Sequence, residues 1–152
     1  MVDYFERKLD DKRRLTIPAE LRAEFANGVV VTRGFKKYLH LYPRSIWEHQ
    51  VEPKLQGNIL DETTADLNVQ FRMGKSDSSL DEKQGRITLE QHLLDYADIT
   101  GKVVAVRAGQ YWRLTGRVQQ WKRRLLQVLT CWKTGRGASA GATAPQFLFW
   151  QR

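Results

Sequence analysis

The sequence predicts an α+β fold that is mainly β, built from two tandem copies of one small unit with short flanking helices. Residues 10–17 reappear as residues 82–89, and Arg14 and Arg86 lie 86 − 14 = 72 positions apart. Later segments repeat in the same order, 29–34 as 103–108 and 38–41 as 111–114. Each unit is too short to bury a good core alone, so the two are expected to share one.

The first copy is expected to open with two strands joined by a turn. Residues 4–9 and 14–17 alternate polar and apolar side chains, which predicts strands. Residues 10–13 are expected to turn, because aspartate hydrogen-bonds nearby backbone and tolerates turn geometry. A helix should follow from Pro18, which suits the first helical position, and should end at residues 27–28, Asn-Gly.

Two further strands and two helices complete the first half. Residues 29–32 and 38–42 are predicted strands, joined by a turn over 34–37. Ser45 and Glu48 match a capping box and predict a helix start, and Pro53 is expected to interrupt that helix. The remaining predictions are a helix over 64–73, with Leu67 and Phe71 on one side, and a polar linker over 74–79.

The second copy is expected to repeat this order. Its predicted elements are a strand near 79–82, a turn at 83–85, a strand at 86–89, a helix at 90–98, strands at 102–107 and 110–115, and a helix at 119–129. The repeat therefore divides the chain into a first unit over 1–56, a connector with a helix over 57–78, a second unit over 79–130 that diverges after 115, and a disordered tail over 131–152.

The net charge of +8 does not describe a uniformly basic protein. Ten of the 25 basic residues lie in residues 99–152, and this segment contains no acidic residue. Residues 1–98 therefore hold 25 − 10 = 15 basic residues against 17 acidic ones, a net charge of −2. Any specific contact of this part with nucleic acid must come from local basic clusters.

Several classes of function have no support in the sequence. His40, His49 and His92 do not lie at helical spacing to another histidine or cysteine, so no metal site is expected. Cys131 has no candidate base, so nucleophilic catalysis is not expected either. No run of 18 apolar residues occurs, and no phosphate-binding glycine loop appears. The sequence thus predicts a protein that is not an enzyme, without metal, cofactor or membrane span.

The two turns carry the candidate functional residues. The first holds Lys12, Arg13 and Arg14, and the second holds Lys83 and Arg86. Cations at the tip of a β-hairpin can reach DNA phosphates, and arginine can grip guanine with two hydrogen bonds. A lone basic turn is more often simply solvated, but the duplicated context favours DNA. The second turn, with two charges, is expected to bind more weakly.

With these turns, the chain resembles the MraZ family, the duplicated member of the AbrB-like swapped-hairpin superfamily. The resemblance rests on residues 10–18 and 82–89 and on the segments 39–43 and 46–48. It implies swapped-hairpin units that form a pseudo-two-fold small barrel. It also implies a cytoplasmic, nucleoid-associated transcription regulator that binds short repeated promoter elements in double-stranded DNA as a ring-like homo-oligomer. The implied targets are the division and cell-wall gene cluster and the regulator's own promoter.

The chain departs from the family pattern at several positions. Arg13 stands at the family's glycine position in the first turn. In the second turn Gly85 is kept, while Gln84 stands for lysine and Glu82 for aspartate. Beyond Leu114 the resemblance ends where the carboxylates end, which suggests a diverged or frame-shifted C-terminus.

Other interpretations of the sequence stay open. One is a non-catalytic oligomeric scaffold that binds no nucleic acid, and another is an antitoxin-like DNA-binding protein with a toxin partner. The segment 113–133 could form a basic amphipathic helix that binds DNA non-specifically or a membrane surface. Arg22 is expected on an exposed helix face without a special role.

Overall fold

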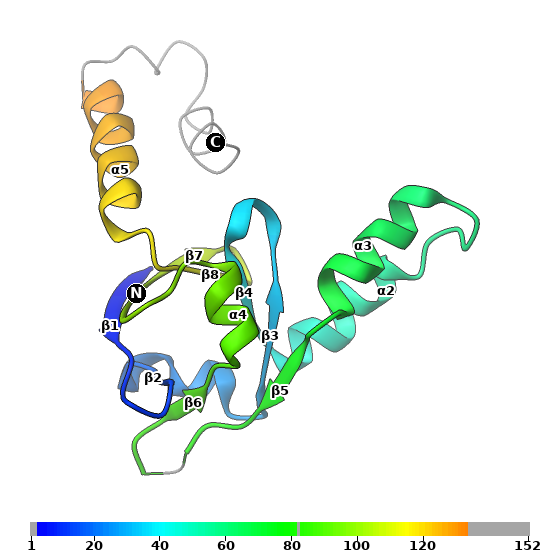
Figure 1. Ribbon diagram of the computed structural model, residues 1–152, viewed down its shortest axis with the longest axis horizontal. Coiled ribbons are helices and arrows are strands. Elements are labelled where there is room, and N and C mark those ends of the chain that lie inside the picture. Colours follow the sequence, from blue (N-terminus) through cyan, green and yellow to red (C-terminus); the bar gives the residue numbers. More distant parts are fainter. Residues whose placement is uncertain (1–2, 82, 134–152) are drawn as a thin grey trace. The chain divides into compact units, whose positions relative to one another are not determined.

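The computed structural model describes residues 3–81 and 83–133, which form an α+β fold dominated by antiparallel β-structure (Figure 1). Residues up to Gly116 make one compact unit, and helix α5 (Val118–Lys133) follows it. The six-stranded sheet of the compact unit has the order β1 (Tyr4–Lys8), β7 (Lys102–Ala108), β8 (Tyr111–Thr115), β4 (Leu39–Pro43), β3 (Val29–Arg33) and β5 (Ser76–Ser78).

A second, two-stranded sheet pairs β2 (Arg14–Thr16) with β6 (Arg86–Thr88). The larger sheet is open, with β1 and β5 at its edges, so the described residues form no closed barrel, contrary to the sequence prediction. None of the described helices is both long and apolar enough to cross a lipid bilayer.

The strand pairing joins the two copies reciprocally. The first strand of the first copy pairs with the second copy, Phe5 opposite Ala105. Strand β5 pairs in the same way with the first copy, Ser76 opposite Val31. The two pairs are equivalent under the repeat. Ser76 lies 76 − 5 = 71 positions after Phe5, and Ala105 lies 105 − 31 = 74 positions after Val31, close to the 72 positions between Arg14 and Arg86. Neither copy therefore completes its own sheet.

Two pairs lie at the centre of this exchange. Leu15 faces Ile87 in the small sheet, and His40 faces Arg113 across β4 and β8. In each pair the partners are equivalent positions of the repeat, since 87 − 15 = 72 and 113 − 40 = 73. The chain thus places each of these positions opposite its own counterpart.

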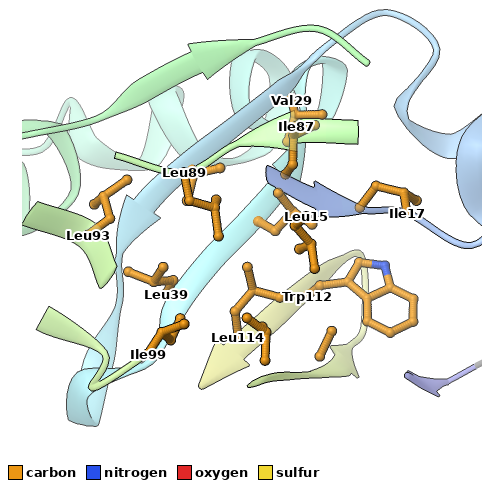
Figure 2. Close-up of a cluster of buried hydrophobic side chains, with 14 of the residues drawn as sticks. Leu15, Ile17, Val29, Leu39, Ile87, Leu89, Leu93, Ile99, Trp112 and Leu114 are labelled. Atoms are coloured by element: carbon orange, nitrogen blue, oxygen red, sulfur yellow. The ribbon is translucent and has the colours of Figure 1, made fainter. Parts of the chain in front are cut away.

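Both copies contribute to one main core (Figure 2). Because side chains alternate along a strand, the middle residues of β2 and β6, Leu15 and Ile87, both point inward and are buried. They share the cluster with Leu39, Leu114 and Trp112 of the larger sheet. The shared core explains how two short units can be stable together.

The first helical segment differs from the sequence prediction. It is a 3₁₀ helix, η1 (Ala19–Phe25), and Pro18 precedes it as the N-cap, with φ −53° and ψ 142°, instead of being its first residue. Glu90, in the same place of the second copy, caps α4 (Gln91–Tyr96) with φ −67° and ψ 145°. Both residues are extended, so what the position requires is an extended conformation, which proline and glutamate can each adopt.

The helix after β4 also differs from its prediction. It runs continuously through α1 (Arg44–Ile46), a π-helical turn η3 (Trp47–Val51) and α2 (Glu52–Leu55). Pro43 is the N-cap and no side chain caps the helix, so the predicted capping box does not form. Pro53 does not end the helix. It lacks an N–H and its ring would crowd the carbonyl four residues earlier, and the wide turn just before it relieves that clash.

The connector and the linker are more ordered than predicted. Helix α3 (Glu62–Arg72) begins two residues earlier than expected, because the Asp61 side chain accepts the N–H of Thr64 at 3.2 Å. The predicted polar linker contains β5, and the strand predicted near 79–82 is absent from residues 79–81. The predicted disordered tail began at residue 131, but residues 131–133 belong to the helix Val118–Lys133. Residue 82 and the rest of the predicted tail, from 134 onward, lie outside the described residues.

Candidate nucleic-acid interface

The β2–β6 ribbon carries a polar outer face over its buried inner one. Arg14 pairs with Thr88, and Thr16 pairs with Arg86. Paired residues share a face, so these four side chains lie together, opposite the buried Leu15 and Ile87; we call them the ribbon face. Its two arginines are diagonal neighbours, whose Cα atoms in such ladders lie roughly 7–8 Å apart.

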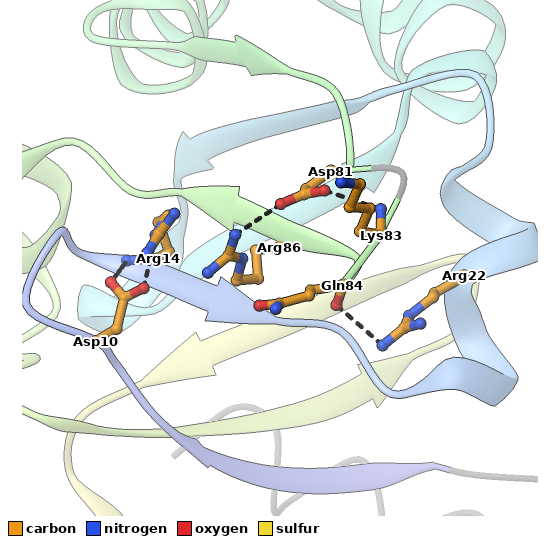
Figure 3. Close-up of polar contacts among 7 residues, drawn as sticks. All are labelled: Asp10, Arg14, Arg22, Asp81, Lys83, Gln84 and Arg86. Atoms are coloured by element: carbon orange, nitrogen blue, oxygen red, sulfur yellow. Dashed lines mark hydrogen bonds and ion pairs between the residues drawn. The ribbon is translucent and has the colours of Figure 1, made fainter.

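In the first turn, Asp10 fixes both the backbone and Arg14 (Figure 3). Its Oδ1 accepts the backbone N–H groups of Lys12 and Arg14, each at 2.9 Å. Its Oδ2 accepts the Arg14 Nε–H at 2.6 Å. Desolvation alone would raise the pKa of Asp10, but the hydrogen bonds from Arg14 and Lys12 together hold this pKa below the usual 3.8. The carboxylate therefore stays charged and keeps Arg14 in one orientation.

In the second turn the same role belongs to Asp81. Its side chain accepts the Lys83 N–H at 2.9 Å and pairs with Arg86 Nη2 at 2.8 Å. The side-chain hydrogen bond from Arg86, followed by the one from the Lys83 backbone, lowers the pKa of this carboxyl. The expected match of Asp10 with Glu82 is thus wrong. Four residues separate Asp81 from Arg86 and three separate Asp10 from Arg14, so the second turn is one residue longer.

Arg13 and Gly85 are equivalent in conformation as well as in sequence. Their φ angles are +60° and +62°, in the left-handed region that glycine enters without a steric penalty. For a residue with a Cβ atom this conformation costs about 1 kcal/mol. The first turn therefore carries an additional charge at some expense of stability, and the Arg13 side chain is exposed.

Arg22 supports the second turn from the first copy. Its Nε–H donates to the carbonyl of Ile17 at 3.1 Å. Its Nη2 donates to the carbonyl of Gln84 at 2.9 Å, a bond that Figure 3 shows. The expectation of an exposed residue without a role is wrong. A Cβ atom on Gly85 would lie 2.2 Å from Arg22 Nε, a second reason for glycine there. The position 72 residues after Arg22 is Leu94, so the first turn has no such arginine in the equivalent place.

The five predicted cations fall into two groups. Lys12, Arg13 and Lys83 are exposed, and within the described residues their side chains make no ion pair. Arg14 and Arg86 are held by carboxylates, and their side chains are 28% and 21% exposed. The structure thus brings the arginines together on one ribbon and puts the other three cations on the turns beside it. The sequence pattern did not identify Asp81 and Arg22 as residues of the site. A repeat offset of 71 instead of 72 would have matched Asp81 to Asp10.

Comparison with known proteins gives the class. A family model described as "MraZ protein, putative antitoxin-like" matches residues 3–68. "Transcriptional regulator MraZ" of Roseiflexus castenholzii is 36% identical over 110 residues, covering 72% of this chain and 76% of the relative. That of Herpetosiphon aurantiacus is 41% identical over 66% of this chain and 69% of the relative. That of Kineococcus radiotolerans is 33% identical over 77% of each.

These matches place the chain in the class of transcription regulators, and the names of the relatives describe no enzyme. The aligned segments cover 100 to 117 residues, similar in length to the part of the chain that contains the two copies. The chain belongs to the MraZ family. The described residues contain no group of three or more side chains suited to hold a metal ion.

Proposed function

We propose that the chain regulates transcription by binding double-stranded DNA with the ribbon face and its two turns. The ribbon face carries the proposal, because a two-stranded antiparallel ribbon fits the major groove. Its inner side is buried in the core, which fixes the outer side chains on a rigid support. The DNA-contacting residues are Lys12, Arg13, Arg14, Lys83 and Arg86.

The two groups of cations suit two kinds of contact. Lys12, Arg13 and Lys83 are exposed beside the ribbon, where flexible cations would meet phosphates and set the position of the protein. Arg14 and Arg86 are oriented by their carboxylates, as base recognition by a bidentate guanidinium requires. One ribbon therefore supplies both affinity and sequence preference.

The same proposal extends to assembly and to the genes regulated. One ribbon makes few contacts, so a ring-like homo-oligomer on short repeated promoter elements would gain affinity by avidity. The exchange of β1 and β5 between the copies supports a swapped-hairpin arrangement. The family suggests the protein's own promoter and the division and cell-wall gene cluster as targets, and a cytoplasmic, nucleoid-associated location.

A gel-shift titration of the chain against the DNA upstream of its own gene, over a salt series, tests the proposal. Arg14→Ala should weaken binding by about 1–3 kcal/mol if this residue contacts a base. Arg72→Ala is the matched control, because Arg72 is also an arginine paired with a carboxylate, Glu52, but lies on α3. Binding that is unaffected by Arg14→Ala and Arg86→Ala would contradict the assignment of the ribbon face.

A scaffold without nucleic-acid binding is the second candidate. It is favoured by the ion pairs that already neutralise Arg14 and Arg86, and by the net charge of −2 over residues 1–98. The salt series separates the candidates, since a scaffold would show no shift of the upstream DNA even at low salt.

A further inference from the structure

Helix α3 has an outer face that nothing in the described structure covers. Its inner face holds Phe71 and Leu67, which belong to a small core around Trp47. On the other side lie Glu62, Asp66, Val69 and Met73, spaced so that they form one stripe, which we call the α3 outer face.

The α3 outer face combines exposed apolar side chains with carboxylates that have no counter-charge among the described residues. Val69 and Met73 are each 59% exposed. Glu62 and Asp66 are exposed like charges at i, i+4, an unfavourable spacing in an isolated helix, and neither makes an ion pair within the described residues. Figure 1 shows α2 and α3 side by side, extending away from the sheet. An apolar and acidic stripe at such a place has the character of an interaction surface.

A surface of opposite charge lies at the turn between β3 and β4. Lys36 and Lys37 have φ angles of +56° and +63°, and the Tyr38 N–H donates to the Phe35 carbonyl at 3.1 Å. These are the features of a type I′ turn, whose two central positions favour asparagine and glycine. Both lysines are exposed, and Phe35 is 47% exposed beside them. We call Phe35, Lys36 and Lys37 the hairpin tip.

The fold itself does not require this hairpin tip. The equivalent connection of the second copy, between β7 and β8, is made by Gly109 and Gln110, with the positive φ angle of +75° on the glycine. Two lysines occupy strained positions where a glycine-containing turn would suffice. This indicates that their positive charge serves a binding contact.

We propose that the hairpin tip of one copy of this chain docks on the α3 outer face of a second copy. Lys36 and Lys37 would then meet Glu62 and Asp66, and Phe35 would pack against the exposed Val69 and Met73. This docking would be the contact between subunits in the homo-oligomer of the proposed function. The interface therefore rests on the proposal that the protein forms a homo-oligomer.

The contact must form between two chains. Within one chain the tip packs on the inner side of α3, with the ring centres of Phe35 and Phe71 5.2 Å apart. Gln70 Nε2 also donates to the Gly34 carbonyl at 2.7 Å. The outer face of the same helix therefore points away from its own tip. Since tip and face are different surfaces, each copy offers one and accepts the other, and such head-to-tail contacts generate a closed ring when the rotation closes.

Light scattering coupled to size exclusion, on the full chain without DNA, tests this contact. The tip variant Lys36→Glu/Lys37→Glu and the face variant Glu62→Lys/Asp66→Lys should each lose the multimer. Mixing the two variants should restore it, because each reversed surface then finds a complementary one on the other variant. Lys8→Glu/Lys102→Glu changes the charge by the same amount on strands β1 and β7 and should leave the multimer intact.

The outcomes separate the contact from the rest of the function. A wild-type multimer that persists in both variants would overturn this interface but leave self-assembly standing. A wild-type monomer would overturn self-assembly together with the interface, while DNA binding by the ribbon face would still be decided by the gel shift. A tip variant that keeps its mass and loses DNA affinity would assign the lysines to phosphate and also overturn the proposal.

Discussion

Single residues explain why the two turns differ. Arg13 and Gly85 share one backbone conformation, yet only the first tolerates a side chain. Gly85 is confined by Arg22, which crosses from the first copy to hold the second turn, whereas Leu94 occupies the position equivalent to Arg22 in the second copy. The first turn can therefore trade glycine for charge, and the second cannot.

Arg13→Gly should stabilise the protein and weaken its binding to DNA. Relief of the left-handed strain is expected to raise the free energy of unfolding by about 1 kcal/mol at most, reduced by the greater freedom of glycine in the unfolded chain. Urea titration and the gel shift measure the two effects. Arg13→Lys is the control, because it keeps both the charge and the strain and should change neither quantity much. A destabilised Arg13→Gly variant would refute the strain argument.

Arg22→Ala should destabilise the protein and loosen the second turn. The substitution removes two charge-assisted donors and leaves two carbonyls without them, at a cost of about 1.5–3 kcal/mol. Hydrogen exchange should become faster at the backbone amides of residues 83–86, while the amides of residues 12–14 keep their protection. Equal acceleration in both turns would show that Arg22 acts on the whole fold instead of on the second turn.

At the scale of elements, each turn works as a loop closed by its own carboxylate. Asp10 and Asp81 bind backbone amides of their turns and the arginine at the start of the next strand. The carboxylate thus couples the shape of the turn to the direction of the arginine on the ribbon. Loss of its charge should release both.

The stability of the protein should therefore depend on these two carboxylates in acid. Their pKa values are lower in the folded protein than the usual 3.8. A carboxyl with a lowered folded pKa contributes stability above its unfolded pKa, and that contribution is lost as the pH falls through the folded pKa. In urea titrations between about pH 5 and pH 3, Asp10→Asn/Asp81→Asn should show a flatter pH dependence than the wild type. Curves that run parallel for this variant and the wild type would contradict the coupling.

The sequence predicted most strands because their side chains alternate, as in residues 14–17 around Leu15. It missed β5, since Ser76, Asp77 and Ser78 have no apolar pattern and become a strand only by pairing with β3. It also missed the role of Asp81. Two adjacent acids, Asp81 and Glu82, fit a repeat equally well, and only the hydrogen bonds decide between them.

At the scale of the whole molecule, the reciprocal pairing makes each half depend on the other. Strands β1, β2, β3 and β4 all have partners that come from residues 76–115. A chain cut in the connector would leave both halves with unpaired strands and an exposed core face. The unit of folding should therefore be the pair of copies.

Separately produced chains 1–73 and 74–152 should test this dependence. Alone, each is expected to be largely unfolded or to associate with itself, and together they should regain the wild-type circular dichroism as a one-to-one complex. The measurements are far-ultraviolet circular dichroism and the mass of the mixture. A first half that folds alone as a stable monomer would refute the shared core.

The pair at the centre of the larger sheet has a consequence for how such a chain can vary. His40 is buried, and its burial, with a smaller contribution from Arg113, lowers its pKa to about 3, so the imidazole is neutral beside the guanidinium. In an assembly of two identical polypeptides this position would face itself, giving two histidines or two mutually repelling arginines. Covalent fusion removes that restriction: each side of the symmetry axis can mutate independently, and a neutral ring can face a permanent cation, a combination that no symmetric dimer could encode.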